Sequence, residues 1–169
     1  MENTDNVYIE LQKHLDKQAV GFPATKSGVE IRILKHLFNP EQAGLALHLN
    51  YQPQSSADIF NSVKGSGISP AKVKNLLEGM VSNGAIGIKE RNGTEYYFTM
   101  PLLVGMLEWH GSKATPQFMA DFGEYMGSGY LKAFASTKTS QMRTIPVEKS
   151  IPGSNAFPLS SEYTSLASS

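Results

Sequence analysis

The sequence predicts a mainly helical fold centred on a winged helix-turn-helix, with flanking helices and an extended C-terminal arm. Helix starts of one kind recur at Asn39, Ser69 and Thr115, each a capping residue followed by proline. Over 57–84, a short periodic segment, a glycine-containing turn and a longer periodic segment follow one another. The Asn-Gly pair at 92–93 lies between two strand-like runs and predicts a β-hairpin, which would form the wing.

We expect four segments along the 169 residues. Residues 1–27 would form an N-terminal helix and the loop that follows it, and 28–100 the winged-helix core. Residues 101–136 would form C-terminal helices. Residues 137–169 lose periodicity and end in a stretch rich in Ser and Pro, which predicts an extended or disordered arm.

Helical periodicity supports this division. Apolar residues recur at helical spacing over 6–18, 29–38 and 40–49. After the hairpin we expect two more helices, over 101–110 and 116–134. The helix that starts after Ser69 would bury a stripe of apolar side chains: Val73, Leu76, Leu77, Met80 and Val81.

The hairpin should have one buried face. Alternation places Ile86 and Ile88 on the same side of the first strand, and Tyr96 and Phe98 on the same side of the second. We expect Ile88, Tyr96 and Phe98 to be buried together.

Composition excludes several classes of protein. Lys plus Arg and Asp plus Glu both number 15, so the basic excess typical of nucleic-acid binders is missing. The chain has no cysteine, which excludes disulfides and thiolate-bound zinc or iron–sulfur clusters in this chain. No apolar run is long enough to span a membrane, and the acidic N-terminus is unlike a signal peptide. We therefore expect a cytoplasmic protein with no membrane partner.

No pattern of catalytic residues is apparent. The four histidines, His14, His36, His48 and His110, form no HExxH and no His-Asp-Ser spacing. The run "GSGISPAK" lacks the lysine pattern of a phosphate-binding loop and reads as the turn between two helices. We expect no enzyme activity, no metal site and no cofactor bound by this chain.

Two sets of residues are candidates for binding. The candidate nucleic-acid contacts lie on the second helix, the turn before it and the wing: Lys64, Lys72, Lys74, Asn75, Lys89 and Arg91. Glu78, Glu90 and Glu95 lie among them and reduce the local basic excess to two. The second set is a stripe at intervals of four, which would pack on its own domain or on a second copy: Phe118, Phe122, Met126, Tyr130 and Phe134.

Residues 20–49 resemble the N-terminal region of 4Fe-4S ferredoxin-type proteins of anaerobic microbes, which opens with a winged-helix-like module. The matching residues are Gly21-Phe22-Pro23, Ser27-Gly28, Glu30, Leu37-Phe38, Pro40-Glu41, Ala43 and Leu45-Ala46-Leu47. The stretch 137–151 is similar to the connector that precedes the family's cysteine-rich domain. Without cysteine, this chain would depend on such a domain in a longer protein for any 4Fe-4S cluster. Arg32, Lys35 and Glu41 in this block are expected to be solvated.

These observations favour a non-catalytic winged-helix interaction module that docks to a redox partner or self-associates as a homodimer. The alternative is a winged-helix DNA-binding transcriptional regulator, whose binding would weaken steeply with salt. A third reading is a small-ligand sensor with a pocket near Trp109.

Overall fold

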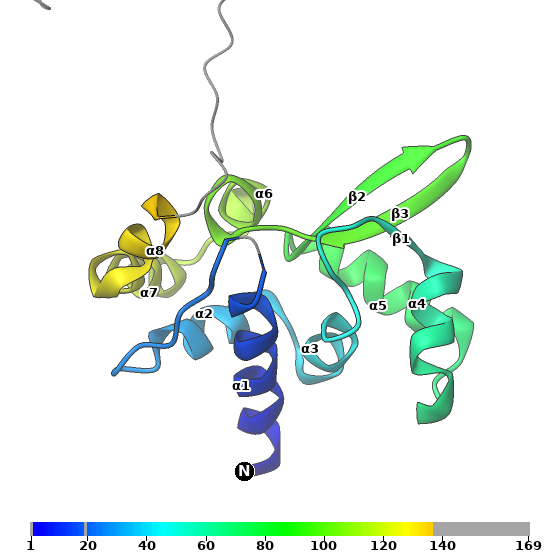
Figure 1. Cartoon of the computed structure of the whole chain (residues 1–169), viewed down its shortest axis with the longest axis horizontal. Coiled ribbons are helices and arrows are strands. Elements are labelled where there is room, and N and C mark those ends of the chain that lie inside the picture. The colour runs from blue at the N-terminus through cyan, green and yellow to red at the C-terminus, as the bar shows by residue number, and fades with distance from the viewer. Residues whose placement is uncertain (1, 19, 137–169) are drawn as a thin grey trace, which may run out of the picture. The chain divides into compact units, whose positions relative to one another are not determined.

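The structure is a computed structural model that describes residues 2–18 and 20–136, all of which fall in one compact unit. This unit is mainly helical and includes a small three-stranded antiparallel sheet (Figure 1). The arm expected over 137–169 lies outside the described residues. The helices are α1 (Glu2–Asp16), α2 (Val29–Leu37), α3 (Pro40–Ala46), α4 (Ser56–Val63), α5 (Pro70–Ser82), α6 (Leu107–His110), α7 (Pro116–Tyr125) and α8 (Leu131–Ala135). The strands are β1 (Gln54–Ser55), β2 (Ile86–Arg91) and β3 (Thr94–Thr99).

The predicted capping residues are confirmed. The side chains of Asn39, Ser69 and Thr115 each accept a hydrogen bond from the backbone N–H three residues later, at the starts of α3, α5 and α7. Ser55 caps α4 in the same way and forms a capping box with Asp58. Each cap satisfies a backbone N–H that the helix itself leaves without a partner.

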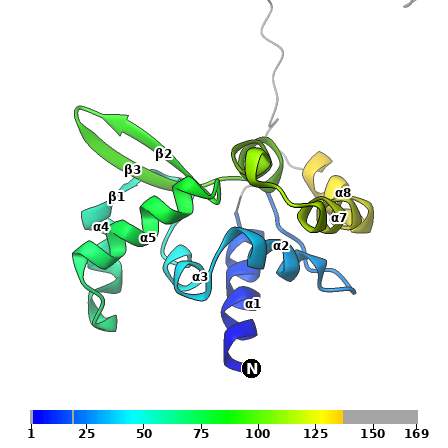
Figure 2. The same ribbon diagram turned by 180° about the vertical axis from the view of Figure 1, so that it is seen from behind.

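Helix packing builds the core from segments that are far apart in sequence. α1 packs against α2 and α3, α2 against α7, and α5 against both α3 and α4. Figure 2 shows α5 between these two neighbours, with the hairpin beyond it. All but one of the residues in the predicted stripe of α5 are buried; Val81 is half-buried.

The hairpin is present, but its buried face differs from the expected one. Ile88 lies opposite Tyr97, which is 1% exposed. Tyr96 and Phe98 are half-buried and lie on the other face. The expectation that they are buried with Ile88 is therefore wrong.

The turn explains this register. Asn92 and Gly93 have φ of 54° and 74°, the positive values that a tight two-residue hairpin turn needs at both positions. Such a turn pairs Arg91 with Thr94, so even-numbered residues of β2 lie opposite odd-numbered residues of β3. The short β1 pairs with β3, which gives the sheet order β1-β3-β2.

The two helices expected after the hairpin are both interrupted. Between Pro101 and α6 the backbone leaves helical geometry at Leu103, Val104 and Gly105. The predicted helix over 116–134 breaks at Gly129, whose φ of 118° is compatible with glycine but not with a helix. The apolar periodicity predicts a continuous helix in each stretch, and it does not reveal these breaks.

Candidate interaction surface

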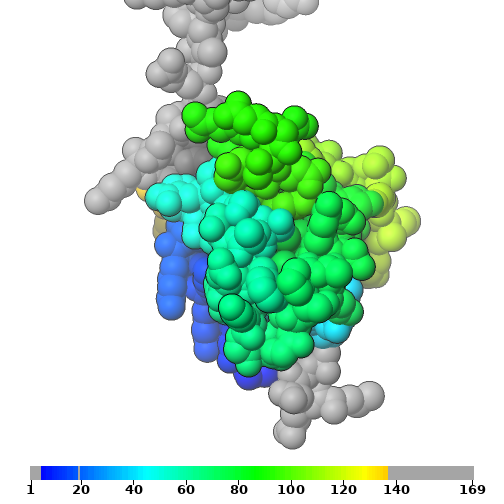
Figure 3. All heavy atoms as spheres, turned by 90° about the vertical axis from the view of Figure 1, so that its right-hand side faces the viewer, coloured from blue at the N-terminus to red at the C-terminus, as the bar shows by residue number. Residues whose placement is uncertain are grey.

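The basic residues of α5 are paired with acidic residues. Lys72 Nζ lies 2.8 Å from a carboxylate oxygen of Glu41, and Lys74 Nζ lies 3.7 Å from one of Glu78. Both pairs are exposed, so they are weak, but they lower the positive charge that α5 presents. Asn75 is exposed on the same helix. Figure 3 shows the face that α4 and α5 form, with the hairpin above them.

The hairpin separates its charges between two faces. Glu90 and Glu95 lie opposite each other on the face that also carries Tyr97, whose hydroxyl donates a hydrogen bond of 2.8 Å to Glu95. Burial and the nearby carboxylates raise the pKa of Tyr97. Lys89 and Arg91 lie on the opposite face, by alternation along β2.

We call this second side the outer face of the hairpin. It carries Gly87, Lys89 and Arg91 from β2 and Thr94, Tyr96 and Phe98 from β3. Lys89 and Arg91 are exposed and form no ion pair with any described residue. Lys64, the remaining candidate contact, is exposed just after α4.

An open groove of about 440 Å³ lies at the base of the outer face. It is lined by Phe98, Thr99, Met100, Pro101, Val104, Gly105, Glu108 and Trp109. Two of these are large apolar side chains left exposed, Trp109 at 49% and Val104 at 44%. The ring of Phe98 lies over Gly87, where a Cβ atom would overlap it. We call this feature the hairpin-base groove.

The wall of this groove is held in an unusual backbone conformation. Val104 has φ 60° and ψ 48°, the left-handed region that a β-branched residue rarely adopts. The carboxylate of Glu108 accepts hydrogen bonds from the N–H groups of Val104 and Gly105. The hydroxyl of Tyr130 accepts a third from the N–H of Leu103. These bonds offset a strain of roughly 1–3 kcal/mol.

A close backbone contact also fixes the base of the hairpin. Gly84 has φ 73°, and a Cβ atom there would overlap the backbone of Trp109 and His110. His110 is buried, and its Nδ1 lies 2.7 Å from the carbonyl oxygen of Asn83. The segment that carries Trp109 is thus packed directly against the end of α5.

The aromatic stripe packs within the described fold. Phe118 and Tyr130 are 0% exposed, and the other three residues of the stripe are half-buried. Phe118 contacts the ring of His110 at 4.7 Å between centroids. The stripe therefore offers little apolar area to a second copy of the chain.

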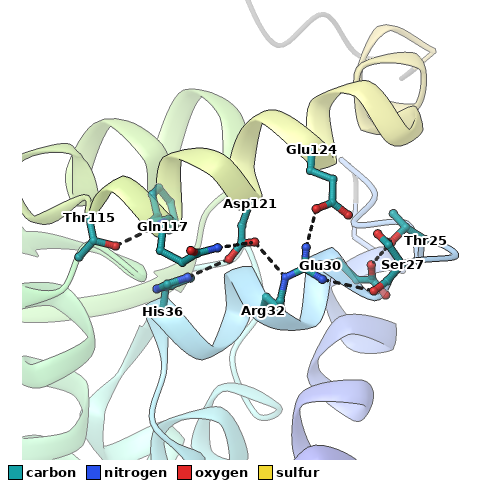
Figure 4. A network of polar contacts seen from close by, with 10 residues as sticks. Thr25, Ser27, Glu30, Arg32, His36, Thr115, Gln117, Asp121 and Glu124 are labelled. Atoms are coloured by element: carbon teal, nitrogen blue, oxygen red, sulfur yellow. Dashed lines mark hydrogen bonds and ion pairs between the residues drawn. The ribbon is translucent and has the colours of Figure 1, made fainter.

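A polar network between α2 and α7 was not predicted from the sequence (Figure 4). The carboxylate of Asp121, 3% exposed, accepts hydrogen bonds from Arg32 Nε at 2.9 Å and His36 Nε2 at 3.0 Å. Gln117 donates a third at 3.3 Å. Arg32 also binds Glu124, at 2.6 Å.

Arg32 is therefore not simply solvated, contrary to expectation. Lys35 and Glu41 are exposed as expected, although each forms a surface ion pair. Burial opposes the charged form of Asp121, but the hydrogen bonds from Arg32, His36 and Gln117 outweigh it and lower its pKa. We call this network the α2–α7 seam. Because Asp121 is buried and both of its carboxylate oxygens accept hydrogen bonds, the network joins the two helices.

A larger open groove, of about 670 Å³, lies between α3 and the turn that joins α4 to α5. Leu45, Val63 and Leu76 form its apolar floor, and the Glu41–Lys72 ion pair borders it. Ser69, which also lines it, caps α5 with its side-chain hydroxyl.

Comparisons with family models, curated proteins and solved structures found no match to this chain. Among residues 2–18 and 20–136, no cluster of three or more His, Cys, Asp or Glu side chains could hold a metal ion. None of the helices in that part of the chain is long and apolar enough to cross a membrane.

Proposed function

We propose that this chain is a cytoplasmic, non-catalytic winged-helix module that binds another protein through the outer face of its hairpin. Support for the winged helix comes from the order of elements: α4, a tight turn, α5 and a hairpin whose sheet has the order β1-β3-β2. The α5 helix takes the place of the recognition helix, and the hairpin takes the place of the wing.

The observation that carries the protein-binding proposal is the division of charge by the hairpin register. A DNA-binding winged helix presents basic groups on its recognition helix and its wing together. Here the lysines of α5 are paired, while Glu90 and Glu95 lie on the face of the hairpin that packs toward α4 and α5. Lys89 and Arg91, which form no ion pair with any described residue, share the other face with aromatic and apolar side chains.

Aromatic residues and arginine are enriched at the centres of protein interfaces, which favours the outer face as the binding surface. The resemblance in sequence makes a redox protein the first partner to test, and self-association the second. A cluster in this system would reside in another domain or in the partner.

The test is whether the chain binds duplex DNA. We expect a fluorescent 20-base-pair duplex to bind with a Kd above about 10 μM at physiological salt, within or weaker than the nonspecific range. Fluorescence anisotropy over a salt series measures this. A nanomolar Kd that weakens steeply with salt, and that Lys72→Glu or Arg91→Glu abolishes, would contradict the proposal and establish the DNA-binding regulator instead.

A further inference from the structure

The chemistry of the outer face points to one kind of partner. This inference rests on the proposed function and specifies the partner's chemistry. The hairpin-base groove is lined mainly by apolar groups, and its one ionisable side chain, Glu108, is occupied by the N–H groups of Val104 and Gly105. Such a groove takes an apolar side chain. Its volume of about 440 Å³ is enough for an aromatic ring or a long aliphatic chain.

Two cations follow the groove along the same face. Side chains on one face of a strand recur every second residue, at about 7 Å. Lys89 therefore lies about 7 Å, and Arg91 about 13 Å, along β2 from Gly87, which is covered by the groove residue Phe98. Neither cation has an ion-pair partner among residues 2–18 and 20–136. The face thus runs from an apolar groove to a positive tip.

An extended peptide has this same spacing, since its side chains on one side also recur every second residue. We propose that the outer face binds an extended acidic segment of a partner protein. One aromatic or long aliphatic side chain of that segment fills the hairpin-base groove. Carboxylates two and four residues away pair with Lys89 and Arg91.

The strained backbone at Val104 supports this assignment. Strain persists where the surrounding structure fixes it, and it gathers at binding sites. Here it turns an exposed apolar side chain toward the groove that Trp109 also lines. A residue that tolerates the left-handed region, such as asparagine, would remove both the strain and the apolar wall.

The experiment titrates the whole protein into fluorescein-labelled synthetic peptides and follows anisotropy. The probes are Phe-Ser-Glu-Ser-Glu, its reverse, and a lysine version, Phe-Ser-Lys-Ser-Lys. We expect one of the two acidic peptides to bind saturably with a Kd below about 1 mM, and the lysine peptide to bind at least about tenfold more weakly. Trp109, the only tryptophan, should change its fluorescence with the same midpoint.

Charge exchange makes the test specific. The double variant Lys89→Glu/Arg91→Glu should bind the acidic peptide at least about tenfold more weakly and gain affinity for the lysine peptide. The double variant Lys26→Glu/Lys132→Glu makes the same change of charge at two exposed lysines outside the hairpin; it is the matched control and should bind as the wild type does. Val104→Asn should weaken binding of the acidic peptide without changing the preference for its charge.

Absence of saturable peptide binding would overturn this inference. An affinity for the acidic peptide that the Lys89→Glu/Arg91→Glu variant leaves unchanged would overturn it too. So would a concentration-dependent dimer in sedimentation that the double variant abolishes, because the occupant would then be a second copy. In these cases the protein-binding function stands if duplex DNA still binds weakly. Tight binding of duplex DNA would contradict the proposed protein-binding function itself, whether or not the peptides bind.

Discussion

The α2–α7 seam and the outer face of the hairpin both carry basic side chains, but these side chains have different surroundings. At the seam, Arg32 and His36 converge on one buried carboxylate, Asp121. On the outer face, Lys89 and Arg91 are exposed beside apolar groups and have no acidic partner in the described part of the chain. The paired charges of the seam join two helices, whereas the charges of Lys89 and Arg91 remain for the partner proposed above.

Gly84, which packs against the backbone of the groove segment, should be the position where substitution destabilises the fold most. Gly84→Ala adds a Cβ atom that overlaps the backbone of Trp109 and His110, which cannot move as a flexible side chain could. We expect a loss of at least 3 kcal/mol in the free energy of unfolding, roughly the sum of backbone strain and overpacking. Urea denaturation followed by circular dichroism measures it.

Gly93→Ala is the matched control for that variant. Gly93 has φ 74°, but a Cβ atom there meets nothing within 4 Å. Its cost should be strain alone, about 1 kcal/mol. Equal losses in the two variants would show that the packing at Gly84 contributes nothing.

Breaking the seam should have the next largest effect. Asp121→Ala leaves Arg32, His36 and Gln117 without their shared acceptor, and we expect a loss of about 3 kcal/mol in the free energy of unfolding. Glu124→Ala removes only the exposed partner of Arg32 and should cost less than about 1 kcal/mol. A seam variant that unfolds like the wild type would mean that these charges do not hold the helices together.

The seam should also govern acid stability. The pKa of Asp121 in the folded chain is below its usual value of 3.8, so its charged form stabilises the fold. That contribution is complete well above pH 4 and is lost as pH falls through the lowered pKa. The stability gap between wild type and Asp121→Asn should therefore shrink from pH 7 to pH 3 in urea melts at each pH. A gap that widened in acid would reverse the sign we assign.

The outer face should show the opposite behaviour, in which a variant becomes more stable and binds less well. Val104→Asn relieves the left-handed strain at an exposed side chain, and we expect the free energy of unfolding to rise by about 1 kcal/mol. Thermal unfolding measures this gain. A loss of stability would mean that the Val104 side chain supports the fold.

Local signals in the sequence were sufficient for much of this fold. The caps at Asn39, Ser69 and Thr115 and the Asn-Gly turn depend on neighbouring residues alone, and all are present. The two-residue turn also determines the register of the two strands, and the register determines which face of the hairpin is buried. The hydrophobic residues alone had predicted a different buried face.

The seam and the groove wall had no such signal. Arg32 and Asp121 are 89 residues apart, and no periodicity pairs them. The break at Val104 also lies in a run that is apolar enough for a helix. The hydrogen bonds that hold the backbone there come from Glu108 and Tyr130, and no periodicity marks them. Lys89 and Arg91 were identified from the sequence, but their separation from Glu90 and Glu95 required the register.

The most direct test of the account is to map the binding surface on the protein itself. The ¹⁵N-labelled chain is titrated with the acidic peptide that binds, and changes in backbone amide resonances are followed by NMR. We expect the changes to concentrate in residues 87–98 and 100–109, with α5 unaffected along its exposed face. Changes centred on Lys72, Lys74 and Asn75 would contradict the account, because they would place the binding surface on α5.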